Sequence, residues 1–205
     1  MKTHSRQVLL GVVAGAAASI AAIIAAAAFG GTSQTAVSAP GQPDVTTHFS
    51  VLSDQAVPAA PASVVAQFEE IHPGISSARQ VRSNASVASY DGAVCAVFEP
   101  GSGGCTAQLD HGVWLMGDMI RAYDSEQAPF NLNLYGVAED GISLISISLA
   151  DGSIRAIPVV HNVFWATLTN TTFNQIEGIT VTSVSGQVSL DPANYFPVEA
   201  ALASP

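Results

Sequence analysis

Basic side chains are scarce in this chain, and their scarcity excludes several functions. Six Lys and Arg stand against sixteen Asp and Glu, which gives the 205 residues a formal net charge of −10 at pH 7. Two of the six, Lys2 and Arg6, precede the first apolar run. Nucleic-acid binding through phosphates needs clustered Lys and Arg, as does a polybasic contact with anionic lipid. We therefore expect no nucleic-acid partner.

Cysteine is almost absent, with only Cys95 and Cys105 in the chain. No cysteine precedes Cys95, so a lipoprotein signal with an acylated cysteine is excluded. In an exported protein, an even pair of cysteines is most simply a disulfide, and closing so short a loop should stabilise the fold by about 3 kcal/mol. The alternative is a metal-binding or nucleophilic thiol, which the absence of Cys-x-x-Cys spacing and of a nearby histidine disfavours.

Motifs for catalysis and metal binding are also missing. The nucleophile-elbow pattern G-x-S-x-G does not occur, and the Gly-Ser-Gly-Gly at 101–104 is best interpreted as a flexible loop between the cysteines. No histidine pair has helical metal-binding spacing, and no loop has EF-hand spacing. We predict no catalytic, cofactor-binding or metal-binding residues and no cofactor. The weaker alternatives are a zinc site from Asp110, His111, Asp118 and His161, and calcium at Glu139, Asp140 or Asp151.

The N-terminus predicts a membrane span. After a short tail at 1–7, residues 8–30 are uncharged, and residues 8–29 alone would form about 33 Å of helix, enough to cross a bilayer core. The positive charges lie only on the N-terminal side, which keeps that end in the cytoplasm and places the rest outside. Cleavage of this segment as a secretory signal after Ser38 is the alternative, and it would release a secreted product.

Residues 31–61 predict a stalk, because prolines recur there among Ser, Thr, Ala and Gln. Within this stretch, the patch at 47–52 has enough apolar residues to dock on the domain that follows. We place that domain at residues 62–205. It should open with an amphipathic helix over 63–72, where the apolar residues share one face and Pro73 ends the helix.

Beyond residue 83 the sequence predicts β-hairpins. Asp-Gly occurs at 91–92, 140–141 and 151–152, and Ser-Gly at 185–186. Such dipeptides tolerate the positive φ of tight turns. The expected strands are 86–90, 93–98, 131–137, 142–149, 154–160, 163–168, 179–184 and 187–190. We therefore predict a mainly β fold, an antiparallel hairpin-rich sandwich or small barrel with one short helix.

Details of these strands give further expectations. In 142–149, Ile145, Ile147 and Leu149 alternate with serines, which is typical of a sheet with one buried face. Pro158 places its strand at a sheet edge or a bulge. Residues 106–110 are compatible with a short helix, and residues 118–124 receive no assignment. The two acidic residues at 69–70 should face solvent. Most of the larger aromatic side chains should pack in the core or at interfaces: Trp114, Phe130, Tyr135, Phe164 and Trp165.

A recurrent pattern is found in residues 135–142, 149–152, 158–159 and 162–164, together with 78–81 and the Cys95–Cys105 segment upstream. In this pattern the chain resembles a group of uncharacterised exported or membrane-anchored actinobacterial proteins. The resemblance implies a small β-rich domain outside the membrane, often behind an anchor. No activity is known for the group, so it implies no catalytic residue.

These observations favour a non-enzymatic domain on the outer side of the cell membrane that binds another envelope protein or a cell-wall component. An edge strand at 154–160 could accept a partner strand. An envelope enzyme such as a cell-wall hydrolase, with Glu99, Asp110 or Asp118 converging in a cleft, is the first alternative. A purely structural spacer is the second.

Overall fold

The computed structural model describes residues 44–75, 77–99, 101–122 and 129–196. The predicted tail, the predicted span at 8–30 and the first part of the predicted stalk lie outside these residues. Among the helices that are described, none has the length and apolarity needed to cross a membrane.

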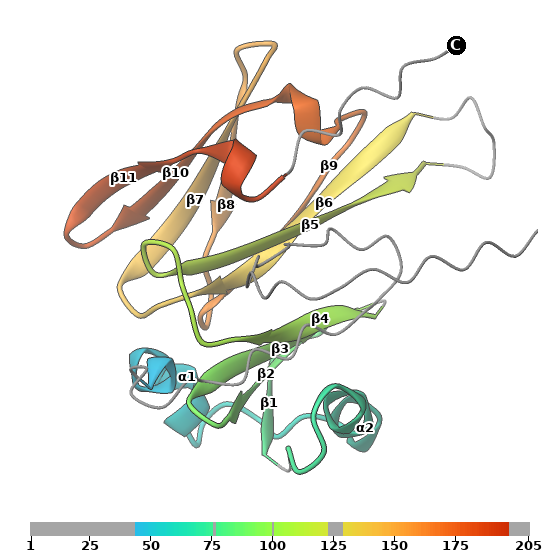
Figure 1. Ribbon diagram of the computed structural model, residues 1–205, viewed down its shortest axis with the longest axis vertical. Coiled ribbons are helices and arrows are strands. Elements are labelled where there is room, and N and C mark those ends of the chain that lie inside the picture. Colours follow the sequence, from blue (N-terminus) through green and yellow to red (C-terminus); the bar gives the residue numbers. More distant parts are fainter. Residues whose placement is uncertain (1–43, 76, 100, 123–128, 197–205) are drawn as a thin grey trace, which may run out of the picture.

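The fold is mainly β, as predicted, with three antiparallel sheets (Figure 1). The first sheet has the order β1-β2-β3-β4, with β1 (Ala78–Arg82), β2 (Ala85–Tyr90), β3 (Ala93–Phe98) and β4 (Ser102–Thr106). The central sheet has the order β5-β6-β9, with β5 (Val113–Arg121), β6 (Phe130–Ala138) and β9 (Val163–Leu168). The outer sheet has the order β11-β10-β7-β8, with β7 (Ile142–Leu149), β8 (Ile154–Pro158), β10 (Ile176–Ser183) and β11 (Gly186–Leu190).

Helical structure is confined to short elements. The described residues contain α1 (Ser50–Ser53), α2 (Ala62–Ile71) and the 3-10 turns η1 (Val45–His48), η2 (Phe173–Gln175) and η3 (Pro192–Asn194). Helix α2 is the helix predicted for 63–72. It buries Val64 and Phe68 against the outer side of the first sheet, whereas Glu69 and Glu70 face solvent as expected.

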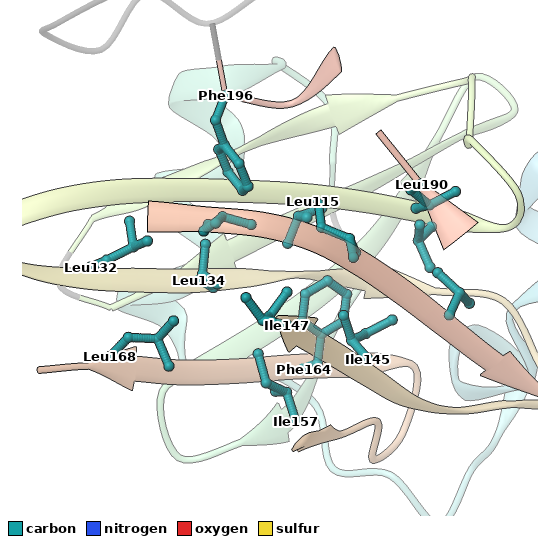
Figure 2. Packing of buried hydrophobic residues seen from close by; sticks show 14 of the residues in the cluster. Leu115, Leu132, Leu134, Ile145, Ile147, Ile157, Phe164, Leu168, Leu190 and Phe196 are labelled. Atoms are coloured by element: carbon teal, nitrogen blue, oxygen red, sulfur yellow. The ribbon is translucent and has the colours of Figure 1, made fainter. Parts of the chain in front are cut away.

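The sheets stack in layers, and β6 lies in the middle of the stack. Leu132 and Leu134 on β6 belong to the cluster shared with the outer sheet, while Tyr135 and Val137 belong to the cluster shared with the first sheet. Figure 2 shows the first of these clusters, in which side chains of the central and outer sheets point toward one another. A strand buried on both faces is nearly continuous in apolar residues, and β6 has this composition from Leu134 to Ala138.

The hairpin predictions are confirmed. All four dipeptides form the turns expected of them, between β2 and β3, β6 and β7, β7 and β8, and β10 and β11. At the first turn Asp91 and Gly92 have φ of 47° and 74°, as a two-residue hairpin turn requires. Ile145, Ile147 and Leu149 are buried on one face of β7. Pro158 lies on β8, an edge strand.

Two local predictions are wrong. Residues 106–110 form no helix, because Thr106 ends strand β4 and residues 107–110 lead into the turn before β5. Residues 102–104 do not belong to a flexible loop, because Ser102 starts β4, in which Gly103 pairs with Val97. A Cβ on Gly103 would lie 2.5 Å from the carbonyl oxygen of Ala96. Glycine is therefore needed at this position because β3 and β4 approach closely, and not because the segment is flexible.

The folded domain begins earlier than residue 62. Phe49, Val51 and Val57 are at most 5% exposed and pack in the cluster between the first and central sheets. Ala59 forms a bridge to Arg79 along the free edge of β1. The prolines suggested a stalk over the whole of 31–61, but the apolar residues between them suffice to dock residues 44–61 on the domain.

Candidate functional site

A groove of about 500 Å³ lies between the docked N-terminal segment and the first sheet. We call it the His161 groove. One wall is formed by Asp54, Ala56, Val57 and Pro58, the other by Gln80, Val81, Arg82 and Ser83, and His161 completes the lining. A smaller hollow of about 240 Å³ shares His161 and is lined further by Ser50, Glu139, Asp140, Gly141, Ile142, Val159 and Asn162.

Local backbone features shape the groove. The pairing of β1 with β2 is irregular between Gln80 and Arg82, and such bulges change the direction of the side chains beside them. His161 and Asn162 form a two-residue turn with φ of 50° and 63°. This turn brings Nδ1 of His161 to 3.4 Å from the carbonyl oxygen of Val81.

Asn162 joins the groove to the body of the domain. Its buried amide donates to the carbonyl of Ala138 and to Oδ1 of Asp140, both at 2.9 Å, and its Oδ1 lies 3.4 Å from the amide of Val51. Asp140 also accepts from the amide of Ser50 at 2.9 Å and from the Ser50 hydroxyl at 2.8 Å. These bonds fasten the segment that forms one wall. They also occupy the Asp140 carboxylate, which disfavours the calcium site considered for this hairpin tip.

A second, solvent-exposed contact also holds the N-terminal segment against the β6–β7 turn. Nδ1 of His48 lies 2.7 Å from Oε1 of Glu139. The hydrogen bond to Glu139 and the negative charge of that residue raise the pKa of His48 above 6.5. The protonated imidazole is therefore the form that this contact favours.

The carboxylates considered for a hydrolase have separate surroundings. Asp110 accepts from the Tyr195 hydroxyl at 2.6 Å, whereas Asp118 lies beside Asn133 far along β5. The stretch of β5 from Val113 to Asp118 alone spans roughly 17 Å at the usual rise of a strand. The structure therefore does not bring Asp110 and Asp118 together. The amide of Glu99 donates to the carbonyl of Asn84 just beyond β3, and none of the three carboxylates lines the His161 groove.

The remaining histidines and the other hairpin carboxylate also lie apart. His72 is buried and stacks on Tyr90 with ring centroids 4.4 Å apart. His111 occupies the turn before β5, 3.7 Å from Asp110. Asp151 accepts from the amide of Ser153 at 2.8 Å within its own turn. In the part of the chain that the structure describes, no three His, Cys, Asp or Glu side chains gather in a way that could hold a metal ion.

A polar row crosses the central sheet on the face toward the first sheet. The Asn133 amide donates to Asp118 at 3.3 Å, and the Thr167 hydroxyl donates to Asn133 at 2.7 Å. Tyr135 stacks beside this row on Trp165, with ring centroids 5.1 Å apart. Burial is the main cause that raises the pKa of Tyr135 to about 12, so its hydroxyl remains protonated. The predicted core position of Tyr135 is confirmed, and we interpret the polar row as structural.

The disulfide is confirmed. Cys95 and Cys105 are directly paired on β3 and β4, with Cα atoms 3.9 Å apart. Both lie in the cluster between the first sheet and α2. The bridge thus joins an edge strand to its neighbour beneath a helix, away from the His161 groove.

Sequence reasoning named only His161 among the residues lining the groove. For the other lining residues the sequence holds one signal. Only four arginines follow residue 30, and two of them, Arg79 and Arg82, lie three positions apart. Comparison with known proteins adds no further guide, because no protein family, curated protein or solved structure matches this chain.

Proposed function

We propose that this chain is a membrane-anchored, extracytoplasmic binding domain without enzymatic activity, and that it binds its partner at the His161 groove. The observation that carries the proposal is the groove itself. Its volume of about 500 Å³ lies within the range of small-ligand sites, which combine apolar walls with a few polar groups. The proposed partner is another envelope protein or a cell-wall component that presents a group of this size.

The composition of the groove favours binding over hydrolysis. Glycoside hydrolysis by the usual route needs two carboxyl groups on either side of the scissile bond, and the groove has a single carboxylate, Asp54. Oδ1 of Asp54 accepts from the amide of Ala56 at 2.8 Å. A cell-wall hydrolase is therefore the less favoured function for this surface.

Two sequence features support the location. The uncharged run at 8–30 with positive charge only before it predicts an anchor with the domain outside, and a disulfide is typical of an oxidising compartment. The intact mass of the protein from its host tests this. A mass near 21.0 kDa supports the anchor, and the mass expected for cleavage after Ser38 would instead mean a secreted domain.

Site-specific photo-crosslinking tests the binding surface. A photoreactive phenylalanine replaces the exposed Ala56 in the groove, and in a matched control it replaces Val188, which is 39% exposed on the outer sheet. In membranes of the native host, we expect an adduct from position 56 and none from position 188. Equal labelling, or no adduct at either position, would contradict the proposal, and the second result would favour a spacer. Release of fragments from purified cell wall would favour the hydrolase.

A further inference from the structure

Arg82 differs from the other arginines of the domain in its contacts. Arg79 donates to the carbonyl of Val57 at 3.1 Å, and the guanidinium of Arg121 lies 4.6 Å from the centroid of the Phe130 ring. Arg155 is exposed on β8, and its charge adds to the Ser153 hydrogen bonds that lower the pKa of the Asp151 carboxyl. The Arg82 side chain makes no hydrogen bond, ion pair or ring contact within the residues that the structure describes.

This lack of contacts is informative because Arg82 is half-buried and lines the groove. A guanidinium that is partly withdrawn from water is normally paired, because desolvation of an unpaired charge is costly. The chain has an excess of acidic side chains, yet none of them pairs with Arg82 in the described residues. The bulge between Gln80 and Arg82 lies at the same place.

The neighbours of Arg82 supply further hydrogen-bond donors. Gln80, Ser83 and His161 line the same groove, and their side chains are able to donate to an oxyanion. On the opposite wall, Val57 and Pro58 are apolar, whereas Asp54 carries a carboxylate that already accepts from the amide of Ala56. A planar guanidinium with adjacent donors matches the geometry of a carboxylate or a phosphate.

We propose that the His161 groove recognises an anionic group, a carboxylate or a phosphate, of its ligand. Arg82 pairs with the anionic group, Gln80, Ser83 and His161 donate additional hydrogen bonds, and the carbon skeleton of the ligand lies along Val57 and Pro58. This inference rests on the proposed function, because it names the chemical class that the binding surface accepts. The net charge of −10 opposes anion binding over the protein as a whole, so an anion needs a local cation, and we expect it to bind beside Arg82.

Nuclear magnetic resonance titrations of the full chain in neutral detergent test the proposal, with sodium acetate and inorganic phosphate as separate probes. We expect shifts of the amide signals of residues 80–83 and 161–162 with at least one probe, and the stronger of the two identifies the preferred anion. Arg82→Gln should weaken that binding at least about tenfold, as loss of a charge-assisted hydrogen bond implies. Arg82→Lys should retain part of it, because the charge remains without the planar fork.

Arg155→Gln is the matched control, since Arg155 is exposed on β8; it should bind like the unmodified chain. An unchanged titration in Arg82→Gln, shifts outside the groove, or the absence of shifts with both probes would overturn the inference. Failure of the proposed function gives a different result. If the adduct at position 56 still forms when Arg82 is replaced by Gln, anion recognition is refuted but the binding surface is not. If no adduct forms at position 56 in the protein that retains Arg82, the binding surface itself is refuted.

Discussion

Substitution of Asn162 tests whether the hydrogen bonds behind the groove hold the N-terminal segment in place. Asn162→Ala removes the donor to the Asp140 carboxylate and the donor to the Ala138 carbonyl. A hydrogen bond to a charged group contributes about 1.5–3 kcal/mol and a neutral one about 1 kcal/mol. Alanine also tolerates the left-handed φ of 63° less well than asparagine, at a further cost of about 1 kcal/mol. We expect a loss of about 4 kcal/mol in the free energy of unfolding.

The glycine variant separates the two contributions. Asn162→Gly loses the same hydrogen bonds, but glycine adopts positive φ without strain, so its loss should be about 3 kcal/mol. Urea unfolding followed by tryptophan fluorescence gives both values, and hydrogen exchange at the amides of Ser50 and Val51 reports whether the segment opens locally. If Asn162→Ala lies within about 0.5 kcal/mol of the unmodified chain, or if the glycine variant is the less stable of the two, the reasoning is refuted.

Three further predictions concern packing, the disulfide and pH. Gly136→Ala places a Cβ in collision with a backbone oxygen of β5, so we expect the free energy of unfolding, measured by heat or urea, to fall by about 3 kcal/mol or more. Gly178→Ala is the control, because the nearest atom to its added Cβ is 3.7 Å away, and it should change stability far less. Reduction of the disulfide should lower the free energy of unfolding by about 3 kcal/mol, and a mass increase other than 2 Da on reduction would mean that the bridge is not present as described. The raised pKa of His48 stabilises the fold below pH 6.5, and this contribution disappears as the pH rises through the folded value. In a titration followed by nuclear magnetic resonance, Glu139→Gln should lower the His48 pKa toward 6.5, and an unchanged pKa would show that the contact does not form in solution.

The sequence predicted best those parts of the fold that local chemistry determines. The Asp-Gly turns and the alternation in β7 depend on neighbouring residues alone, and both predictions are confirmed. Two further turns of the same kind, at His111-Gly112 and His161-Asn162, have positive φ but were missed. Histidine is enriched in that conformation, yet it is a weaker turn signal than Asp-Gly.

Strands β1, β4 and β5 were missed for a different reason. Their sequences reflect contacts with other parts of the fold, and a local pattern does not contain that information. At Gly104, for example, an added Cβ would lie 3.2 Å from the Trp114 ring. The same limit applies to the His161 groove. Residues 54–58, 80–83 and 161 meet there only because the N-terminal segment returns to the sheets, so only the folded arrangement places Arg82 in the lining of the groove.

The docked N-terminal segment has a consequence for the order of folding. His48 contacts a residue 91 positions later, and Val51 one 111 positions later, whereas the strands pair mostly with close neighbours along the chain. At a synthesis rate of ~5–20 residues per second, this segment waits on the order of ten seconds for its partners. Contacts between distant residues also form late because of the entropy of loop closure. We expect residues 48–51 to be the last part of the domain to dock.

The same segment is the point at which tension from the N-terminal side would enter the domain. A pull on the chain before Asp44 reaches the contacts of His48 and Ser50 with the β6–β7 turn before it reaches any strand pair. Those few bonds would break before the sheets separate, and their loss would remove one wall of the His161 groove. The shape of the groove, and with it the ligand binding that we propose, would then depend on mechanical load along the backbone of the domain.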